Sequence, residues 1–371
     1  MMGLDSARFA LEAATGGKNT LISDDTGLPS VMVRIPMFLR SDVLPGEADE
    51  PCSAFIVGGR VLDCIYVSKY INIIKNGRAY SLPGRDPAHT VSIGEARAAC
   101  AAKGRGWHLM TNAEWAAIAH WCVKNGTPPR GNSNFGRCHD HPHERGVLAR
   151  QRRGEGPEDE MRTLTGTGPD SWNHDGAASG IADLNGNIWE FVSGLRIVNG
   201  EIQVIPDNDS AMNVDESAHS PLWRAVLQDG SLALPGSPGT LKYDGVSPGL
   251  SSPDDRIAGD GYRLSTELRN PNYTGPERDV SHRAYGMMNF FDMQCSPGVS
   301  APRRLVELGL FPRQDYRDGG HFFLRNYGVR YAARGGSWYD RAGGGIWDVY
   351  MRETDAFRFP DMGFRAVYAE Y

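Results

Sequence analysis

Two stretches near residue 100 combine a helix-start signal with apolar positions at helical spacing. Ser92-Ile93-Gly94-Glu95 and Thr111-Asn112-Ala113-Glu114 each place a hydroxyl residue three positions before a glutamate, the pattern of a capping box. They predict one helix over 96–103 and a second that runs from Thr111 to Gly126. Because apolar side chains of the second helix recur at i, i+3, i+4 and i+7, one stripe must face a core: Trp115, Ile118, Ala119 and Cys122.

Apolar runs bounded by turn residues predict short strands elsewhere. Asn199-Gly200, inside an apolar run over 197–204, is the strongest short hairpin signal in the chain. A second hairpin is expected where Gly58-Gly59-Arg60 separates the runs 54–57 and 61–66. The remaining predicted elements are a helix over 4–14 and strands over 31–35, 329–332, 345–349 and 363–369.

The spacing of these elements suggests one large unit with irregular parts. Residues 1–50 are predicted to form an irregular N-terminal arm, and residues 51–371 a single domain. Within that domain, residues 206–320 are rich in Pro, Gly, Ser and Asp and are predicted to be an insertion with little regular structure. The 45 glycines and 23 prolines exceed the roughly 12% of an ordinary chain, so a loop-rich α+β fold is expected.

Charge and cysteine usage exclude some partners and compartments. The 371 residues carry a net charge of −6, with 39 basic against 45 acidic side chains, so no nucleic-acid partner is expected. No apolar run is long enough for a signal peptide or a membrane helix, so we expect synthesis in the cytoplasm without membrane insertion. The six cysteines show no CxxC spacing and are expected to be reduced, mostly buried thiols.

Two clusters could hold a metal. Alternate histidines in His139-Asp140-His141-Pro142-His143-Glu144 would share one face of a strand and, with the carboxylate, suit zinc or iron. Pro142 interrupts such a strand, however, which favours a solvated polar loop. Calcium could find oxygens on Asp183, Asn185, Asn187 and Glu190, but an Asx-rich turn is the favoured interpretation. No metal or cofactor is therefore expected.

Four motifs in a fixed order identify a family resemblance. They are Thr111 to Trp115, Asp183 to Phe191, Arg334-Gly335-Gly336-Ser337-Trp338, and Gly363-Phe364-Arg365. Together they resemble the formylglycine-generating-enzyme branch of the C-type-lectin fold over roughly residues 53–371. The resemblance implies a C-type-lectin-like α+β fold, loop-rich, with two helices around a small twisted antiparallel sheet and long insertions. In that family the working cysteines lie between the last two motifs, whereas residues 337–362 here contain none. Without a thiolate nucleophile or metal ligand, an enzyme is not expected.

The segment between these last two motifs has the composition of a binding surface. Six of the 25 residues over 337–361 are aromatic and eight are charged, with no lysine among them. Enrichment in aromatics and arginine with depletion of lysine is typical of interface hot spots. Trp338 and Trp347 are expected in the core. Tyr339-Asp340-Arg341 and residues 357–361 alternate charge with aromatic side chains and are expected to be exposed.

The same segment, 334–365, also resembles the variable region of diversity-generating retroelement proteins, a non-enzymatic branch of this fold. Fixed members of that pattern match Arg334-Gly335-Gly336, Trp338, Ala342, Gly345 and Gly363-Phe364-Arg365. Such systems randomise the adenines of AAC, which is an asparagine codon. Changes in the first two bases of AAC can encode every residue that this chain has at the family's asparagine positions, except Glu353. With Arg341 and Asp348, which depart from the pattern, the ligand-binding residues that the resemblance implies are Ser337, Tyr339, Asp340, Arg341, Gly343, Asp348, Tyr350, Arg352, Glu353, Phe357, Phe359 and Asp361.

The expected function is therefore non-enzymatic ligand or receptor binding, diversified by a retroelement. The resemblance implies a protein or glycan receptor on a cell surface, and a phage tail tip or bacterial surface assembly as the carrier. A homo-oligomer remains open. The alternative is a formylglycine-generating-type oxidase or an inactive relative of it.

Overall fold

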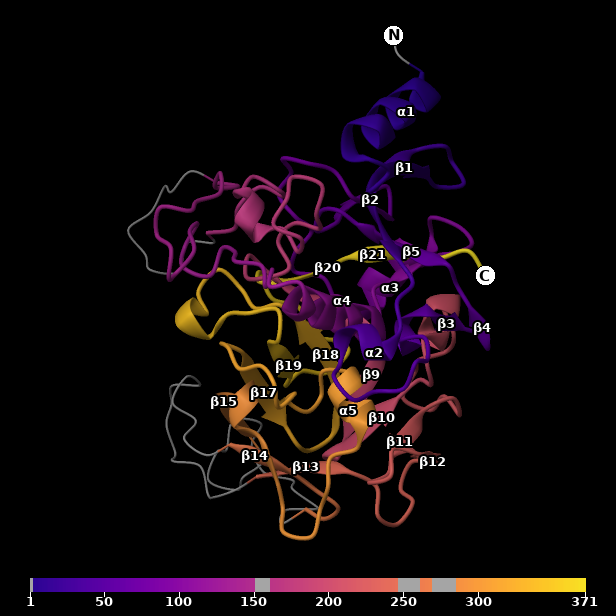
Figure 1. Cartoon of the computed structure of the whole chain (residues 1–371), viewed down its shortest axis with the longest axis vertical. Coiled ribbons are helices and arrows are strands. Elements are labelled where there is room, and N and C mark those ends of the chain that lie inside the picture. The colour runs from indigo at the N-terminus through magenta and orange to yellow at the C-terminus, as the bar shows by residue number, and fades with distance from the viewer. Residues whose placement is uncertain (1–2, 151–160, 246–260, 269–284) are drawn as a thin grey trace.

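Short helices and many short strands make up the fold, which is mixed α+β and loop-rich (Figure 1). The computed structural model describes residues 3–150, 161–245, 261–268 and 285–371. Its α-helices are α1 (Leu4–Thr15), α2 (Arg40–Val43), α3 (Ile93–Ala101), α4 (Asn112–Lys124) and α5 (Arg303–Glu307). Single 3₁₀ turns are η1 (Ser53–Phe55), η2 (Asp170–Trp172), η3 (Asp209–Met212), η5 (Phe290–Asp292) and η6 (Arg341–Gly343).

The strands are distributed over two larger sheets and two small hairpins. Their bounds are β1 (Asn19–Ser23), β2 (Pro29–Pro36), β3 (Ile56–Val57), β4 (Arg60–Val61), β5 (Cys64–Ser68), β6 (Ile73–Lys75), β7 (Arg78–Tyr80), β8 (Trp107–Leu109), β9 (Trp189–Val198), β10 (Glu201–Val204), β11 (Arg224–Val226), β12 (Leu232–Ala233), β13 (Lys242–Gly245), β14 (Tyr262–Ser265), β15 (Tyr285–Asn289), β16 (Gln294–Cys295), β17 (His321–Arg325), β18 (Val329–Arg334), β19 (Val349–Met351), β20 (Met362–Phe364) and β21 (Ala366–Tyr368).

In the described ranges, the smaller main sheet has the order β1-β2-β5-β21-β8 and is antiparallel throughout. The larger sheet runs β15-β17-β19-β18-β9-β10-β13-β14-β16, with β11, β12 and β20 paired at its side. Helices α3 and α4 lie between β5 and β21 above and β9 and β18 below in Figure 1, and both helices contact β9. The chain leaves the larger sheet at β20 and enters the smaller one at β21, so the single residue between them, Arg365, joins the two sheets.

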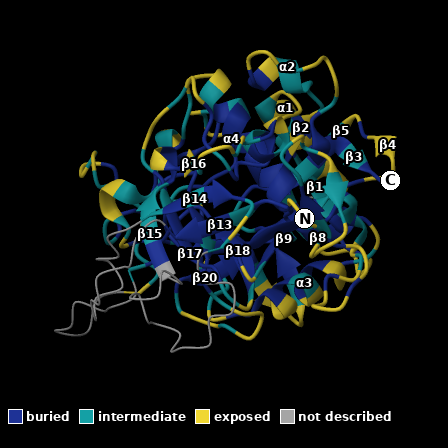
Figure 2. Ribbon diagram, turned by 90° about the horizontal axis from the view of Figure 1, so that it is seen from below, coloured by how far each residue is buried: buried dark blue, intermediate teal, exposed yellow. Residues whose placement is uncertain are grey.

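Both predicted capping boxes are confirmed. Thr111 Oγ1 accepts the Glu114 backbone N–H at 3.1 Å, and a Glu114 carboxylate oxygen accepts the Thr111 N–H at 2.8 Å. Ser92 and Glu95 make the same pair of bonds at the start of α3. The apolar stripe of α4 faces the core as expected, but the helix is buried well beyond that stripe. Figure 2 shows the buried residues gathered around the central strands and α4, with the exposed positions mostly in surrounding loops.

The Asn199-Gly200 hairpin is also confirmed, since β9 and β10 pair across it. Both turn residues have positive φ, 47° and 77°, as this turn type requires. The hairpin places β9 at the centre of the larger sheet, paired with β10, β18 and β20. The glycine-rich hairpin forms as β3 and β4, and the expected helix over 4–14 is α1.

Two expectations about irregular segments are wrong. The strand predicted over 31–35 is confirmed as β2, but the N-terminal arm is less irregular than expected, because β1 pairs with β2 and both strands join the smaller sheet. The described parts of the predicted insertion 206–320 contribute β11 to β16, all of which join the larger sheet. In addition, the run 345–349 is not a strand until Val349, and the run 363–369 is divided between the two sheets.

Among the described residues, no helix is long and apolar enough to cross a bilayer.

Candidate functional site

The terminal segment 334–365 begins and ends in the middle of the larger sheet. Strand β18 pairs antiparallel with β9 on entry, and β20 pairs parallel with the same strand on exit. Between them, β19 returns briefly to the sheet beside β18 and β17. The segment therefore forms two loops, residues 335–348 and 352–361. The strands at the ends of these loops are held in the sheet by backbone hydrogen bonds.

Arg334 anchors the entry to this segment. Its guanidinium is fully buried and donates to Asn112 Oδ1 at 3.0 and 2.6 Å, with further bonds to the Leu308 and Gly309 carbonyls at 3.1 Å. Burial lowers the pKa of Arg334 to about 10. Because Asn112 is the first residue of α4, this contact fastens the segment to the helix.

Arg365 anchors the exit. It forms a two-pronged ion pair with Glu190 on β9, at 2.9 and 2.7 Å, and donates to the Ser68 and Ala182 carbonyls at 2.8 and 2.9 Å. Both side chains of the pair are essentially without exposure. Burial raises the pKa of Glu190, while the Arg365 charge acts in the opposite direction. Since its carboxylate is engaged in this pair, Glu190 has a structural role that explains why it occurs in the motif.

Gly335 and Gly336 are required by close approach as well as by backbone angle. Their φ values are +90° and +80°. A Cβ on Gly335 would lie 2.9 Å from the Trp115 ring, and a Cβ on Gly336 would lie 2.4 Å from Asp348 Oδ2. Both distances are shorter than a Cβ tolerates, so a side chain at either position would displace its neighbour.

The twelve expected ligand-binding residues do not form one exposed surface. Tyr339, Arg341 and Phe359 are exposed, at 37% for Tyr339 and 50% for Phe359. A second group is half-buried: Asp340, Gly343, Tyr350, Glu353 and Phe357. A third group is buried: Ser337, Asp348, Arg352 and Asp361. The exposure expected of Asp361 is therefore wrong.

Hydrogen bonds within the segment explain this burial. Asp361 accepts a hydrogen bond from the Tyr339 hydroxyl, and its carbonyl accepts the Trp189 N–H at 2.7 Å. Asp340 Oδ2 accepts from the Ser337 backbone N–H at 2.6 Å and from its hydroxyl at 3.0 Å. Alternation of charge and aromatic side chains suggested exposure, but a carboxylate can be buried where backbone N–H groups and hydroxyls satisfy it.

The exposed part of the segment is centred on the loop 357–361. The Phe357 and Phe359 rings stack with centroids 6.0 Å apart and planes at 11°. Between them, Arg358 reaches Glu95 at the start of α3 with two bonds of 2.9 and 3.0 Å. The bond from Tyr339 to Asp361 brings that tyrosine to the same loop. We call Tyr339, Phe357, Arg358 and Phe359 the aromatic–arginine surface.

Other members of the expected set lie apart from this surface. Tyr350 donates to Glu353 at 3.1 Å and packs with Trp189 in the core. Arg341 and Gly343 lie in η6, where the Arg341 N–H bonds to the Ser133 carbonyl at 2.7 Å. A Cβ on Gly343 would lie 1.8 Å from the His321 ring, so a side chain there would have to displace that ring.

Sequence reasoning missed one supporting residue, Arg162. It is buried, donates to Asp86 at 3.0 Å and to the Pro360 carbonyl at 3.2 Å, and lies 5.8 Å from the centre of the Trp338 ring. Arg162 therefore contacts both loops of the segment, the first through Trp338 and the second through Pro360. No motif marks this arginine, because its partners are distant in the sequence.

Three carboxyl groups lie beneath the aromatic–arginine surface. Burial raises the pKa of Asp340 to about 7 and that of Asp361 to about 6. Asp348 is fully buried with no hydrogen-bond partner on Oδ2, and burial raises its pKa well above the ordinary value. The Asp340 charge raises the pKa of Asp348 further. These groups take up protons in the folded protein that the unfolded chain releases.

We expect Asp348→Asn to stabilise the protein at neutral pH. Asparagine keeps an acceptor for the His321 N–H, which Asp348 Oδ1 accepts at 2.7 Å, and removes a buried charge. The expected gain is about 1–2 kcal/mol near pH 7.5, because asparagine avoids the cost of ionising a buried carboxyl, which is about 1.4 kcal/mol for each unit by which the pKa is raised. Because the folded-state pKa values are raised, stability should fall as pH rises from about 4 through 7. Thermal melts across that range should show a shallower fall for Asp348→Asn. The exposed Asp355→Asn variant is the control, and equal slopes for all three proteins would contradict the expectation.

Three of the four residues considered for calcium use side-chain oxygens in other bonds, with Glu190 paired to Arg365, whereas Asn185 Oδ1 is buried without a hydrogen-bond partner in the described part of the chain. Asp183 accepts the Gly166 N–H at 2.7 Å, and Asn187 Oδ1 accepts the Thr163 N–H at 2.8 Å. Asp183 and Asn187 have positive φ, 62° and 66°, as in an Asx-rich turn. These bonds hold the turn that leads into β9.

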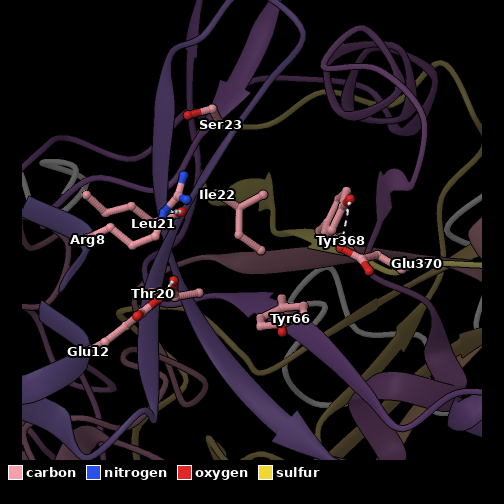
Figure 3. Close-up of a pocket in the computed structure, with 9 residues that line it drawn as sticks. All are labelled: Arg8, Glu12, Thr20, Leu21, Ile22, Ser23, Tyr66, Tyr368 and Glu370. Atoms are coloured by element: carbon pink, nitrogen blue, oxygen red, sulfur yellow. Dashed lines mark hydrogen bonds between the residues drawn. The ribbon is translucent and has the colours of Figure 1, made fainter. Parts of the chain in front are cut away.

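A separate cavity of about 390 Å³ lies between α1, β1, β5 and β21 (Figure 3). Several of its polar groups bond to one another: Thr20 donates to Glu12 at 2.5 Å, and Arg8 to the Leu21 carbonyl at 2.9 Å. Tyr368 likewise donates to Glu370 at 3.3 Å. Sequence reasoning did not single out these residues, and their mutual bonding is sufficient to explain their positions.

No protein-family model and no curated protein matches the sequence. Among solved structures, the chain is similar to Treponema denticola variable protein 1, with 11% identity and a TM-score of 0.32 over 95% of this chain and 99% of that chain. By its name, that protein is a variable protein. A likeness with so low a TM-score carries no argument, and the function must be argued from the chain's own residues.

Proposed function

We propose that the protein is a non-enzymatic receptor-binding protein whose terminal segment is diversified by a retroelement. The observation that carries the proposal is the contrast within residues 334–365. Arg334 and Arg365 are buried and bonded to distant elements, whereas Tyr339 and Phe359 are exposed. Side chains on such a surface can change without disturbing the base that holds them, which is what a diversified binder needs.

The proposed fold is C-type-lectin-like, of the formylglycine-generating-enzyme type. Its support is the order of the four motifs and the way they meet: the Trp115 indole donates to the Ile346 carbonyl at 2.8 Å, and Arg365 pairs with Glu190. Motifs that are far apart in the chain thus contact one another at the base of the terminal segment. The proposed receptor is a protein or glycan on a cell surface, with the protein carried on a virion or a bacterial surface assembly.

The alternative, an oxidase of the formylglycine-generating type, is less well supported. All six cysteines lie in the described ranges and are free, and none occurs in the terminal segment. Burial raises the pKa of the Cys52 thiol to about 12 and raises the pKa of Cys100 and Cys122 as well. A thiol that stays protonated is a poor nucleophile and a poor metal ligand.

The DNA around the coding sequence gives the first test. A near-copy of the stretch encoding 334–365, differing mainly at adenines and adjacent to a reverse transcriptase gene, is expected. Its absence from the complete source genome would contradict the retroelement part of the proposal.

Binding gives the second test. Tyr339→Ser and Phe359→Ser are each expected to weaken binding to glycan arrays or bacterial cells by about 1–3 kcal/mol, as for aromatic hot spots. Phe9→Ser on α1, which removes an aromatic side chain that is 73% exposed, is the matched control and should bind like the unmodified protein. Equal binding by all variants would show that recognition lies outside this segment.

A further inference from the structure

A tight loop brings His141, His143 and Glu144 together. Arg137 and Arg145 pair across its base, and the Cys138 N–H donates to the Glu144 carbonyl at 3.1 Å. The Glu144 N–H donates to the His141 carbonyl at 2.9 Å, which closes a four-residue turn. Pro142 is the second residue of that turn, the position proline prefers. The residue that seemed to interrupt a strand therefore helps to build the loop.

The three side chains present ligand atoms toward one another. One atom from each of His141, His143 and Glu144 lies within 4.8 Å of the others. The two imidazole rings are 5.9 Å apart between centroids, and neither makes a hydrogen bond in the described part of the chain. Because His143 is exposed and His141 is half-buried, modest rotation would bring the ligands to the roughly 2 Å bonds of a zinc site.

Glu144 is already oriented for such a role. Trp172 Nε1 donates to its Oε2 at 3.0 Å, Arg130 Nη2 donates to its Oε1 at 2.5 Å, and Arg130 Nε lies 3.0 Å from both carboxylate oxygens. Since Arg130 Nε needs only one of these oxygens, a lone pair on the other can serve an ion while the ion pair persists. Ligating carboxylates in metal sites are commonly held by hydrogen bonds of this kind.

We propose that His141, His143 and Glu144 bind a divalent transition-metal ion, zinc being the best match. Two imidazoles and one carboxylate suit zinc better than calcium or magnesium, which prefer oxygen ligands only. None of the three proposed ligands belongs to the terminal segment. The test of metal binding is therefore independent of the test of receptor binding.

Titration of the metal-free full-length protein with zinc chloride, followed by calorimetry, tests the site. We expect one ion per chain, with affinity at least about tenfold lower in His141→Ala and in His143→Ala. His139→Ala is the matched control, because His139 lies in the same loop outside the group and should leave the affinity unchanged.

Cobalt(II) in place of zinc distinguishes this site from the cysteines. Its spectrum should lack a thiolate charge-transfer band and should change in the His141 and His143 variants. No zinc binding by the unmodified protein would overturn the proposal, as would unchanged affinity in both variants or a thiolate band. Circular dichroism of each variant checks folding, which neither substitution should disturb because neither ring has a hydrogen bond to lose.

Discussion

Replacing Trp115 by alanine is expected to lower the free energy of unfolding by about 3–5 kcal/mol, as for a fully buried large aromatic. The side chain is 1% exposed, and its ring lies against Gly335 at the base of the terminal segment. Its indole N–H also bonds to the Ile346 carbonyl at 2.8 Å, so the substitution leaves both a cavity and an unpaired acceptor. Urea or guanidinium unfolding measures the loss. Trp189→Ala should behave similarly, since Trp189 is also buried.

The control for this prediction lies on the aromatic–arginine surface. Phe359→Ala is expected to change stability by no more than about 0.5 kcal/mol, because half of the side chain is exposed. Trp115→Phe should fall between the two, since it keeps most of the volume but loses the donor. Comparable losses for Trp115→Ala and Phe359→Ala would refute the separation of a fixed base from a changeable surface.

Arg365→Gln is expected to cost about 3–5 kcal/mol, because it leaves the Glu190 carboxylate buried without its partner. The chain offers a matched comparison, since Arg358 and Glu95 make an equally two-pronged pair at the surface, with about half of each side chain exposed. Arg358→Gln should leave the unfolding midpoint nearly unchanged, because water screens exposed pairs.

A double variant isolates the buried pair. Adding Glu190→Gln to Arg365→Gln removes the unpaired charge, so the two losses should sum to more than the loss in the double variant. Chemical denaturation of the four proteins gives the coupling energy. Strict additivity would mean that Arg365 acts mainly through its bonds to the Ser68 and Ala182 carbonyls.

The predictions that failed have a common cause. Residues 19–23 and the described parts of 206–320 carry only weak local signals, yet both supply strands. Strands such as β13 and β14 are four residues long and receive their partners from distant parts of the chain. Short strands have little intrinsic preference of their own, and the neighbouring strand decides whether they form.

The sequence alone determined the local structure that depends on neighbouring residues. The capping boxes at Ser92 and Thr111 and the turn at Asn199-Gly200 act within a few residues, so their signals are complete in the chain. Burial in the terminal segment was decided only by the tertiary structure. Asp361 is buried because Tyr339, 22 positions away, donates to it, and Glu190 because Arg365 lies across the sheet. The same is true of Glu144 in the histidine loop, which is buried because Arg130 and Trp172, 14 and 28 positions away, donate to it. Hydrogen bonds and ion pairs between distant residues offset the cost of burying charge, and no local pattern records them.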